Sequence, residues 1–234
     1  MEEINLQMNQ NFLSKFKYNI THWYQPIYCL KSNNVFAYEA LLRDTSKLQV
    51  SPPEIFVEAD KIGHKNTLDF ISIKIALEAF KNESSPLFIN VYPSTLLKKD
   101  FMHWWDTHIP PIIPVVLELL ENESVINWEE LKTVTKKLNS RGVKIAVDDM
   151  GSGYSSFQQF IELEPDYIKL DKYFAEGLST NNQKQKVVKS LVDLVSDRTK
   201  IIIEGIEKEE DLNVAKLLGV PYAQGYLLGR PSPR

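Results

Sequence analysis

The chain has 234 residues, of which 43% are hydrophobic and 25% charged, and its formal net charge is −4. Length and composition fit one globular domain with a core large enough to need no disulfide, and Cys29 is the only cysteine. The acidic balance argues against a polymeric nucleic acid as partner. No stretch approaches the roughly 18 apolar residues of a membrane helix. We therefore expect a cytoplasmic protein without a membrane partner, and a single cysteine suits that reducing compartment.

Short β-rich runs alternate along the chain with longer segments whose apolar residues follow helical spacing. Strands are predicted at Trp23–Leu30, Val35–Leu42, Leu87–Val91, Val115–Leu119, Lys144–Val147, Tyr167–Leu170, Ile201–Ile203 and Tyr222–Leu227. Helices are predicted at Pro53–Ile62, Leu68–Phe80, Trp128–Ser140, Ser155–Leu163, Lys184–Ser196 and Glu209–Leu218. Ser51 followed by two prolines marks a helix start, and Gly142 and Gly219 follow helical segments as C-terminal caps do.

This alternation predicts an α/β fold, a modified TIM-like (β/α)8 barrel. Only a short stretch with the SNN segment at residues 32–34 separates the first two runs, so these should form an antiparallel hairpin that leaves one strand of the barrel reversed. An open doubly wound sheet is the alternative, but no Gly-rich phosphate loop follows the first strand-to-helix turn. We expect residues 1–20 to form an N-terminal helical extension and residues 21–234 to form the barrel domain.

Polar side chains stand in or just after seven successive strands of this predicted barrel. They are Glu39, Asn90, Glu118, the pair Asp148 and Asp149, Lys169, Glu204 and Gln224. One such residue alone is usually a solvent-facing group or a turn former. Several carboxylates at one barrel mouth, however, would repel each other and lose hydration, and a divalent cation is the simplest compensation. Because the set contains oxygen ligands and no histidine or cysteine, it indicates Mg²⁺ or Mn²⁺.

The segment AVDDMGSGYSSF, residues 146–157, is the most specific local signal. Adjacent aspartates at a strand end can place one carboxylate between two metal ions while its neighbour binds one of them. Gly151 and Gly153 then allow a sharp backbone turn near a ligand. Taken alone, the same segment could be an ordinary acidic β-turn, so the metal interpretation depends on the other strand-end residues.

The residues also resemble a known family. YQPIYCLKSNNVFAYEALLR is similar to the opening of EAL domains, the bacterial cyclic di-GMP phosphodiesterases, whose name motif is here Glu39, Ala40 and Leu41. Further blocks follow in the family's order: FINVYPSTL, VVLELLE, AVDDMGSGYSSF, PDYIKLDKYF, IIIEGIEKEEDL and PYAQGYLLGRP. They extend from about Tyr24 to Pro231. The resemblance implies a TIM-like barrel with an antiparallel first strand.

The resemblance also implies roles for individual residues. One metal would be bound by Glu39, Asn90, Glu118 and Asp148. Asp148 would bridge to a second metal, whose site Asp149 and Glu204 complete, and Lys169 would contact the attacking water. Glu39, Asp149, Lys169 and Glu204 are thus the expected catalytic residues, and Gln25, Leu41, Arg43 and Gln224 would lie at the substrate. Glu121 would support the loop after Asp149, which in the family also shapes the dimer contact.

Two positions depart from the family pattern. Leu120 stands where a threonine is usual, and Met150 replaces a phenylalanine after the aspartate pair. Neither is an expected metal ligand. Loss of the threonine hydroxyl could loosen the support of the loop or change dimer coupling, whereas Met150 keeps apolar bulk and adds flexibility.

The function implied is hydrolysis of cyclic di-GMP to the linear dinucleotide pGpG, by water activated between two Mg²⁺ or Mn²⁺ ions, in a homodimer. The alternative is a weak or inactive EAL-type module that binds cyclic di-GMP or a protein partner. Because degenerate members usually lose metal ligands and none is lost here, the sequence favours the enzyme. A different phosphodiester substrate on the same scaffold is a further alternative.

Overall fold

The computed structural model describes residues 19–46, 50–109, 114–120, 123, 125, 127–151, 156–195 and 198–234. The predicted N-terminal extension therefore lies almost wholly outside the described residues. Strands are β1 (Ile20–Cys29), β2 (Asn34–Asp44), β3 (Leu87–Val91), β4 (Val115–Leu119), β5 (Lys144–Met150), β6 (Tyr167–Leu170), β7 (Lys200–Ile203) and β8 (Tyr222–Ala223). Helices are α2 (Pro52–Lys61), α3 (Lys65–Phe80), α4 (Pro93–Leu96), α5 (Phe101–His108), α6 (Trp128–Asn139), α7 (Ser156–Leu163), α8 (Lys172–Ala175), α9 (Asn182–Leu194) and α10 (Glu209–Leu217), with a 3₁₀ turn η1 (Leu178–Thr180).

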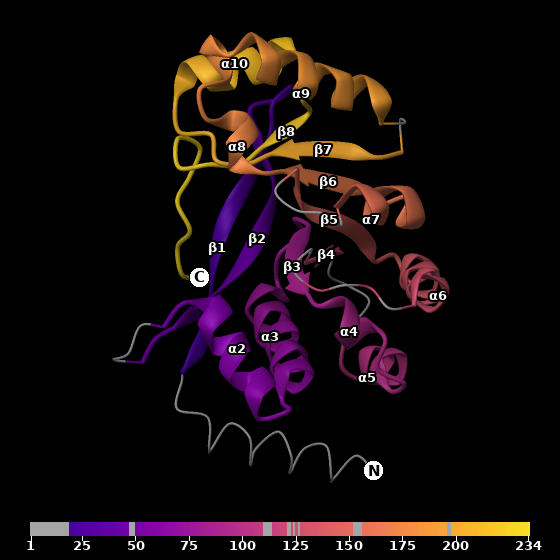
Figure 1. Cartoon of the computed structure of the whole chain (residues 1–234). Coiled ribbons are helices and arrows are strands. Elements are labelled where there is room, and N and C mark those ends of the chain that lie inside the picture. Colours follow the sequence, from indigo (N-terminus) through magenta and orange to yellow (C-terminus); the bar gives the residue numbers. More distant parts are fainter. Residues whose placement is uncertain are drawn as a thin grey trace.

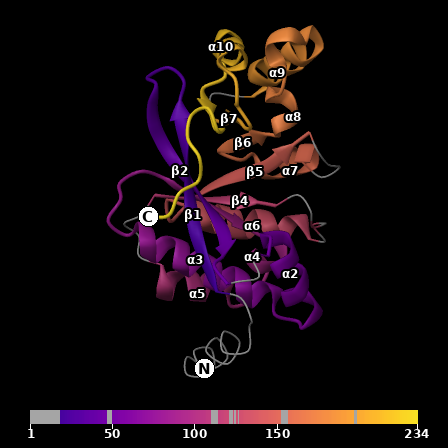
Figure 2. The same ribbon diagram turned by 90° about the vertical axis from the view of Figure 1, so that its left-hand side faces the viewer.

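The eight strands close into a barrel in the order β1 to β8, with the helices outside it (Figures 1 and 2). β1 runs antiparallel to both of its neighbours, β2 and β8. The strands from β2 to β8 pair in parallel. The predicted barrel with a reversed first strand is confirmed, and the closed order excludes the open doubly wound sheet.

The barrel interior is filled by side chains from six strands. They are Ile27, Ala37, Phe88, Val116, Ala146 and Ile202, and all are at most 2% exposed. Three further apolar clusters lie between the strands and the surrounding helices. The interior set matters for function, because it fixes which side chains of each strand point toward the barrel axis.

The helix ends follow the predicted sequence signals. The backbone N–H of Ser51 donates to the Glu54 carboxylate in a capping box at the start of α2. Gly142 and Gly219 have φ values of 84° and 87°, a left-handed conformation that suits glycine after a helix. Helices α4, α5 and α8 were not predicted; in α5 the helical pattern was obscured because the adjacent residues Trp104 and Trp105 are both buried.

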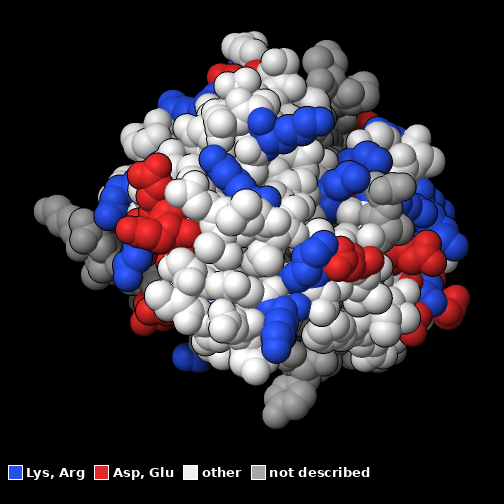
Figure 3. Space-filling model, turned by 90° about the horizontal axis from the view of Figure 1, so that it is seen from above, with Lys and Arg blue, Asp and Glu red and all other residues white. Residues whose placement is uncertain are grey.

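The segment after β8 is not the longer strand that was predicted. β8 ends at Ala223, and Gly225 then packs flat on the backbone of Ile206, leaving no room for a Cβ atom. From there the chain runs beside β1, where Ser232 and Tyr24 exchange two backbone hydrogen bonds (Figure 2). None of the described helices is long and apolar enough to cross a membrane. On the face seen in Figure 3, basic and acidic side chains are interspersed.

Candidate active site

The predicted strand-end residues meet at one mouth of the barrel. A cavity of about 630 Å³ opens there. Its lining includes Glu39, Asn90, Asp148, Asp149, Lys169, Glu204 and Gln224, together with Gln25 and Leu41. Glu118 lies directly beneath, fully buried. The structure therefore brings together, from separate strands, the acidic and amide side chains that the sequence placed at strand ends.

The pleat of the strands explains this convergence. Side chains two residues apart on a strand point to the same side. Five of the mouth residues stand two positions beyond one that fills the barrel: Asn90 after Phe88, Glu118 after Val116, Asp148 after Ala146, Glu204 after Ile202 and Glu39 after Ala37. On the reversed strand β1 the order inverts, and Gln25 precedes Ile27. The same alternation that places apolar side chains in the barrel core thus places these polar side chains in a ring at its mouth.

Lys169 lies at the centre of this ring and is 1% exposed. Its Nζ contacts one oxygen of each of four carboxylates: Glu204 at 2.8 Å, Glu118 at 3.1 Å, and Glu39 and Asp148 at 3.2 Å. Burial alone would lower the pKa of Lys169, but these four carboxylates raise it well above its ordinary value. Lys169 is therefore a fixed cation.

Hydrogen bonds orient Glu39 among these neighbours. Gln224 donates from Nε2 to one Glu39 oxygen at 2.6 Å, and Asn90 donates from Nδ2 to the other at 3.4 Å. Burial disfavours the charged Glu39, yet Lys169 and the amide donors outweigh it and lower the pKa of Glu39. Because both amide groups donate, their oxygens are left to face the site.

Several buried oxygens of the site have no hydrogen-bond donor among the described residues. They are Asn90 Oδ1, both oxygens of Glu118, Asp148 Oδ1 and Gln224 Oε1. Glu118 Oε1 and Asp148 Oδ1 lie within ion-pair distance of Lys169 Nζ, but neither contact has the alignment of a hydrogen bond. Buried oxygens without a hydrogen-bond donor are costly, and a hard divalent cation is the partner that would satisfy them. The residues present therefore fit a metal.

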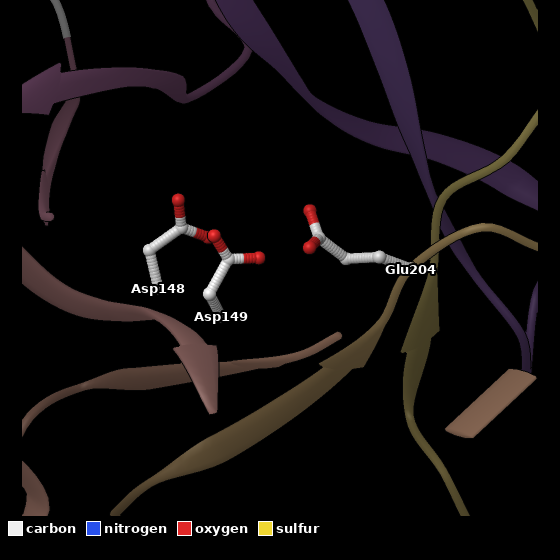
Figure 4. A group of neighbouring side chains, drawn as sticks. All are labelled: Asp148, Asp149 and Glu204. Atoms are coloured by element: carbon white, nitrogen blue, oxygen red, sulfur yellow. The ribbon is translucent and has the colours of Figure 1, made fainter. Parts of the chain in front are cut away.

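Asp148, Asp149 and Glu204 form a group whose carboxylate oxygens lie within 4.8 Å of one another. Figure 4 shows the two aspartates side by side, with the Glu204 carboxylate directed toward them across the site. Burial, with repulsion from Asp148 and Glu39, raises the pKa of Glu204 to about 8 despite the attraction of Lys169. Burial also raises the pKa of Glu118 well above its usual range. A cation bound among these carboxylates would offset both their burial and their mutual repulsion.

Asp149 has a backbone conformation that is unusual for a residue with a side chain. Its φ is 51°, in the left-handed region. This interrupts the β5–β6 ladder between Val147 and Met150, so two consecutive aspartates face one site rather than opposite sides of the sheet. Gly151 follows with φ 104° and lies so close to Phe174 that a Cβ atom there would be 2.4 Å from the ring. The tight turn supports the interpretation that strain is stored at a functional position.

The predicted substrate residues do not all face the same cavity. Gln25, Leu41 and Gln224 line the large cavity. Arg43 instead lines a second cavity of about 160 Å³, where its Nη1 donates to the Leu42 carbonyl and its guanidinium lies 5.6 Å from the Trp23 ring centroid. The predicted loop-supporting Glu121, and Gly153 of the loop it would support, lie outside the described residues.

The second cavity contains polar groups that sequence reasoning missed. Leu41, Asn90 and Leu120 line both cavities, so the two adjoin. Buried His22, Asp69 and Ser72 also line the smaller one. Burial, together with Arg43, lowers the pKa of His22 to about 4. These residues precede or interrupt apolar runs, and no local motif marks them.

Comparison with known proteins identifies the chain's family. The EAL domain family profile matches residues 10–231. The chain belongs to the EAL domain family. Among curated relatives, it is 30% identical to the cyclic di-GMP phosphodiesterase PdeA of Borreliella burgdorferi, over 91% of this chain and 34% of that protein. It is also 30% identical to the probable cyclic di-GMP phosphodiesterase PdeI of Escherichia coli, over 90% of this chain and 28% of that protein. This EAL chain thus spans about a third or less of the length of these relatives.

Solved EAL structures share the fold. Klebsiella pneumoniae BlrP1, in a complex with manganese and cyclic di-GMP, superimposes with a TM-score of 0.79 at 27% identity, over 91% of this chain and 56% of that chain. A calcium and cyclic di-GMP complex of the same protein gives a TM-score of 0.78. An EAL domain protein from Listeria monocytogenes has a TM-score of 0.80 at 22% identity, and the match covers 97% of this chain and 93% of that chain.

Proposed function

We propose that this EAL domain hydrolyses cyclic di-GMP to the linear dinucleotide pGpG in a metal-dependent reaction. The observation that carries the proposal is the group of Asp148, Asp149 and Glu204 beside buried oxygens of Asn90 and Glu118 that have no hydrogen-bond donor among the described residues. Relatives named as cyclic di-GMP phosphodiesterases and a neighbour that binds manganese with this nucleotide support it.

We assign two metal positions to the residues of the mouth. Glu39, Asn90, Glu118 and Asp148 would hold one ion, and Asp149 and Glu204 would hold the second together with Asp148. Mg²⁺ or Mn²⁺ in these positions would lower the pKa of water and stabilise charge on the phosphate. Lys169, fixed by its carboxylate neighbours, would orient the attacking water and favour its deprotonated form.

We propose that the two adjoining cavities divide the substrate between them. The polar large cavity suits the scissile phosphodiester, with Gln25 and Gln224 as hydrogen-bonding groups on its wall. The smaller cavity combines apolar walls with Arg43 and buried Asp69, which suits a flat base attached to a phosphate. Leu41, between the two, would contact the substrate from the strand that carries Glu39.

We also propose that the domain is a cytoplasmic homodimer. Phe157 and Ile161, one helical turn apart on α7, are 50% and 69% exposed. They follow the segment after Asp149, so an interface there would be coupled to the site. Sedimentation of the wild type and of Ile161→Lys tests this, and an unchanged sedimentation coefficient would exclude α7 from a dimer.

Incubation of the purified chain with cyclic di-GMP and Mn²⁺, followed by chromatography, tests the activity itself. We expect cyclic di-GMP to disappear as pGpG accumulates. Tight nucleotide binding without product would instead identify a binding module. Release of a different product from another phosphodiester, with cyclic di-GMP left intact, would show that the substrate assignment is wrong.

A further inference from the structure

The ends of β3 and β4 carry two proposed metal ligands that are direct neighbours. Asn90 and Glu118 pair across the two strands. The ladder continues for one more hydrogen bond, from the Leu120 N–H to the Val91 carbonyl at 3.2 Å. Beyond that point, among the described residues, no ladder hydrogen bonds join the segment after β3 to the segment after β4. The relative position of the two ligands therefore depends on what joins the segments that follow.

Glu123 makes this connection from the segment between β4 and α6. Its Oε2 accepts a hydrogen bond from the backbone N–H of Ser94, at 2.7 Å. Its Oε1 pairs with Lys65 Nζ at 2.5 Å. The side chains of Glu123 and Lys65 are only 20% and 18% exposed, so solvent screens the pair less than it would a surface salt bridge.

Lys65 is one of several side chains on α3 that contact the segment after Asn90. Lys65 Nζ lies 3.9 Å from the centroid of the Tyr92 ring. One residue later, Asn66 donates to the hydroxyls of Ser94 and Thr95, each at 2.9 Å. One turn later, Asp69 accepts from the Tyr92 N–H at 2.8 Å and from the Thr95 hydroxyl at 2.7 Å. Residues 92–95 are thus held against α3, and Glu123 connects the segment that follows β4 to them.

We propose that Glu123 is a positioning residue for the metal site, acting with Lys65 to hold the Glu118 strand end against the Asn90 strand end. This inference rests on the proposed function only in naming the ion. Neither residue lines the large cavity or the smaller one, so we place neither in contact with the metal or the substrate. Glu123 supplies support to the β4 exit at a point three residues after Leu120, where the chain departs from the family pattern.

Direct measurement of Mn²⁺ binding by calorimetry, with folding checked by circular dichroism, tests this role. We expect Glu123→Ala to weaken Mn²⁺ binding about tenfold, as is typical when support of a metal ligand is lost. Glu123→Gln, which keeps an acceptor for Ser94, should bind more tightly than Glu123→Ala, and Lys65→Met should weaken binding as well. The double variant that combines Lys65→Met with Glu123→Ala should bind Mn²⁺ no more weakly than Glu123→Ala alone. The matched control is Glu129→Ala, an 87% exposed carboxylate on α6, which should bind as wild type.

A purely structural role would lower the unfolding temperature of Glu123→Ala and leave its Mn²⁺ affinity at the level of the control. That result, or an unchanged affinity in folded Glu123→Gln and Lys65→Met together, would overturn the proposal. Because Mn²⁺ affinity is measured without substrate, failure of the positioning role can be told apart from failure of the proposed function. If wild type binds Mn²⁺ but hydrolyses no cyclic di-GMP, the function fails, whereas a weakened affinity of the Glu123 variants would still support the positioning role.

Discussion

Replacing Lys169 with methionine removes a buried positive charge and little volume. The structure places Lys169 Nζ within 3.2 Å of an oxygen of each of four carboxylates. Breaking a single buried ion pair by removing one partner costs about 3–5 kcal/mol. Part of this loss will be relieved because carboxylates such as Glu118 and Glu204, whose pKa values are already raised by burial, take up protons. We therefore expect Lys169→Met to lose about 3–5 kcal/mol of unfolding free energy in the absence of metal.

Divalent metal should change this loss in a defined direction. If the carboxylates hold Mn²⁺, the ion supplies positive charge that the variant lacks, so Mn²⁺ should restore more stability to Lys169→Met than it adds to wild type. The variant should also lose rate more than substrate affinity, because the proposed partner of Lys169 is the attacking water.

Urea unfolding of both proteins in EDTA and in Mn²⁺ measures the effect. Lys144→Met is the matched control, since Lys144 pairs with Asp166 at 2.8 Å but is 55% exposed and lies at the opposite end of β5 from the mouth. The control should lose about 1 kcal/mol or less, equally in both conditions. A Lys169→Met protein as stable as wild type in EDTA, or one that Mn²⁺ stabilises no more than wild type, would refute the reasoning.

Four further substitutions probe other parts of the site. Glu39→Ala and Asp148→Ala should each lower hydrolysis about a thousandfold, the equivalent of several kcal/mol of metal-dependent stabilisation, with circular dichroism unchanged; near-normal turnover would show that the ligand assignment is wrong. Leu120→Thr should raise turnover or tighten the dimer in sedimentation, whereas a fall in both activity and stability would make Leu120 a packing residue. Asp69→Asn should flatten the pH dependence of stability. Burial raises the pKa of folded Asp69 from 3.8 to about 7, so the folded state holds its proton longer and wild type loses up to about 1.4 kcal/mol per pH unit between these values as pH rises. Parallel urea midpoints for the two proteins across this range would contradict that assignment.

The fold and the mouth residues could be predicted because both follow from the same local alternation. Phe88 and Asn90, or Ala146 and Asp148, differ by one pleat period, so a correct strand assignment also places the polar side chain at the barrel axis. The hairpin that contains Glu39 was equally local, since only four residues separate β1 from β2. These features need no knowledge of distant contacts.

Other features depend on contacts between distant segments, which no local pattern encodes. The sequence analysis expected Lys169 beside a water but not among four carboxylates from separate strands. Arg43 was predicted as a substrate residue, but no local pattern indicated that it lines a second, smaller cavity adjoining the first. Glu123 carries no motif, and its contacts join segments 58 and 29 residues away in the chain.

The most direct test of the account is hydrolysis of cyclic di-GMP by one preparation before chelation, after it and after metal is restored. Chromatography would follow pGpG formation in Mn²⁺, in excess EDTA and after Mn²⁺ is returned in excess over the chelator. The account predicts turnover in the first and third conditions and none in the second. Undiminished turnover in excess EDTA would contradict the metal site that Asp148, Asp149 and Glu204 are proposed to form.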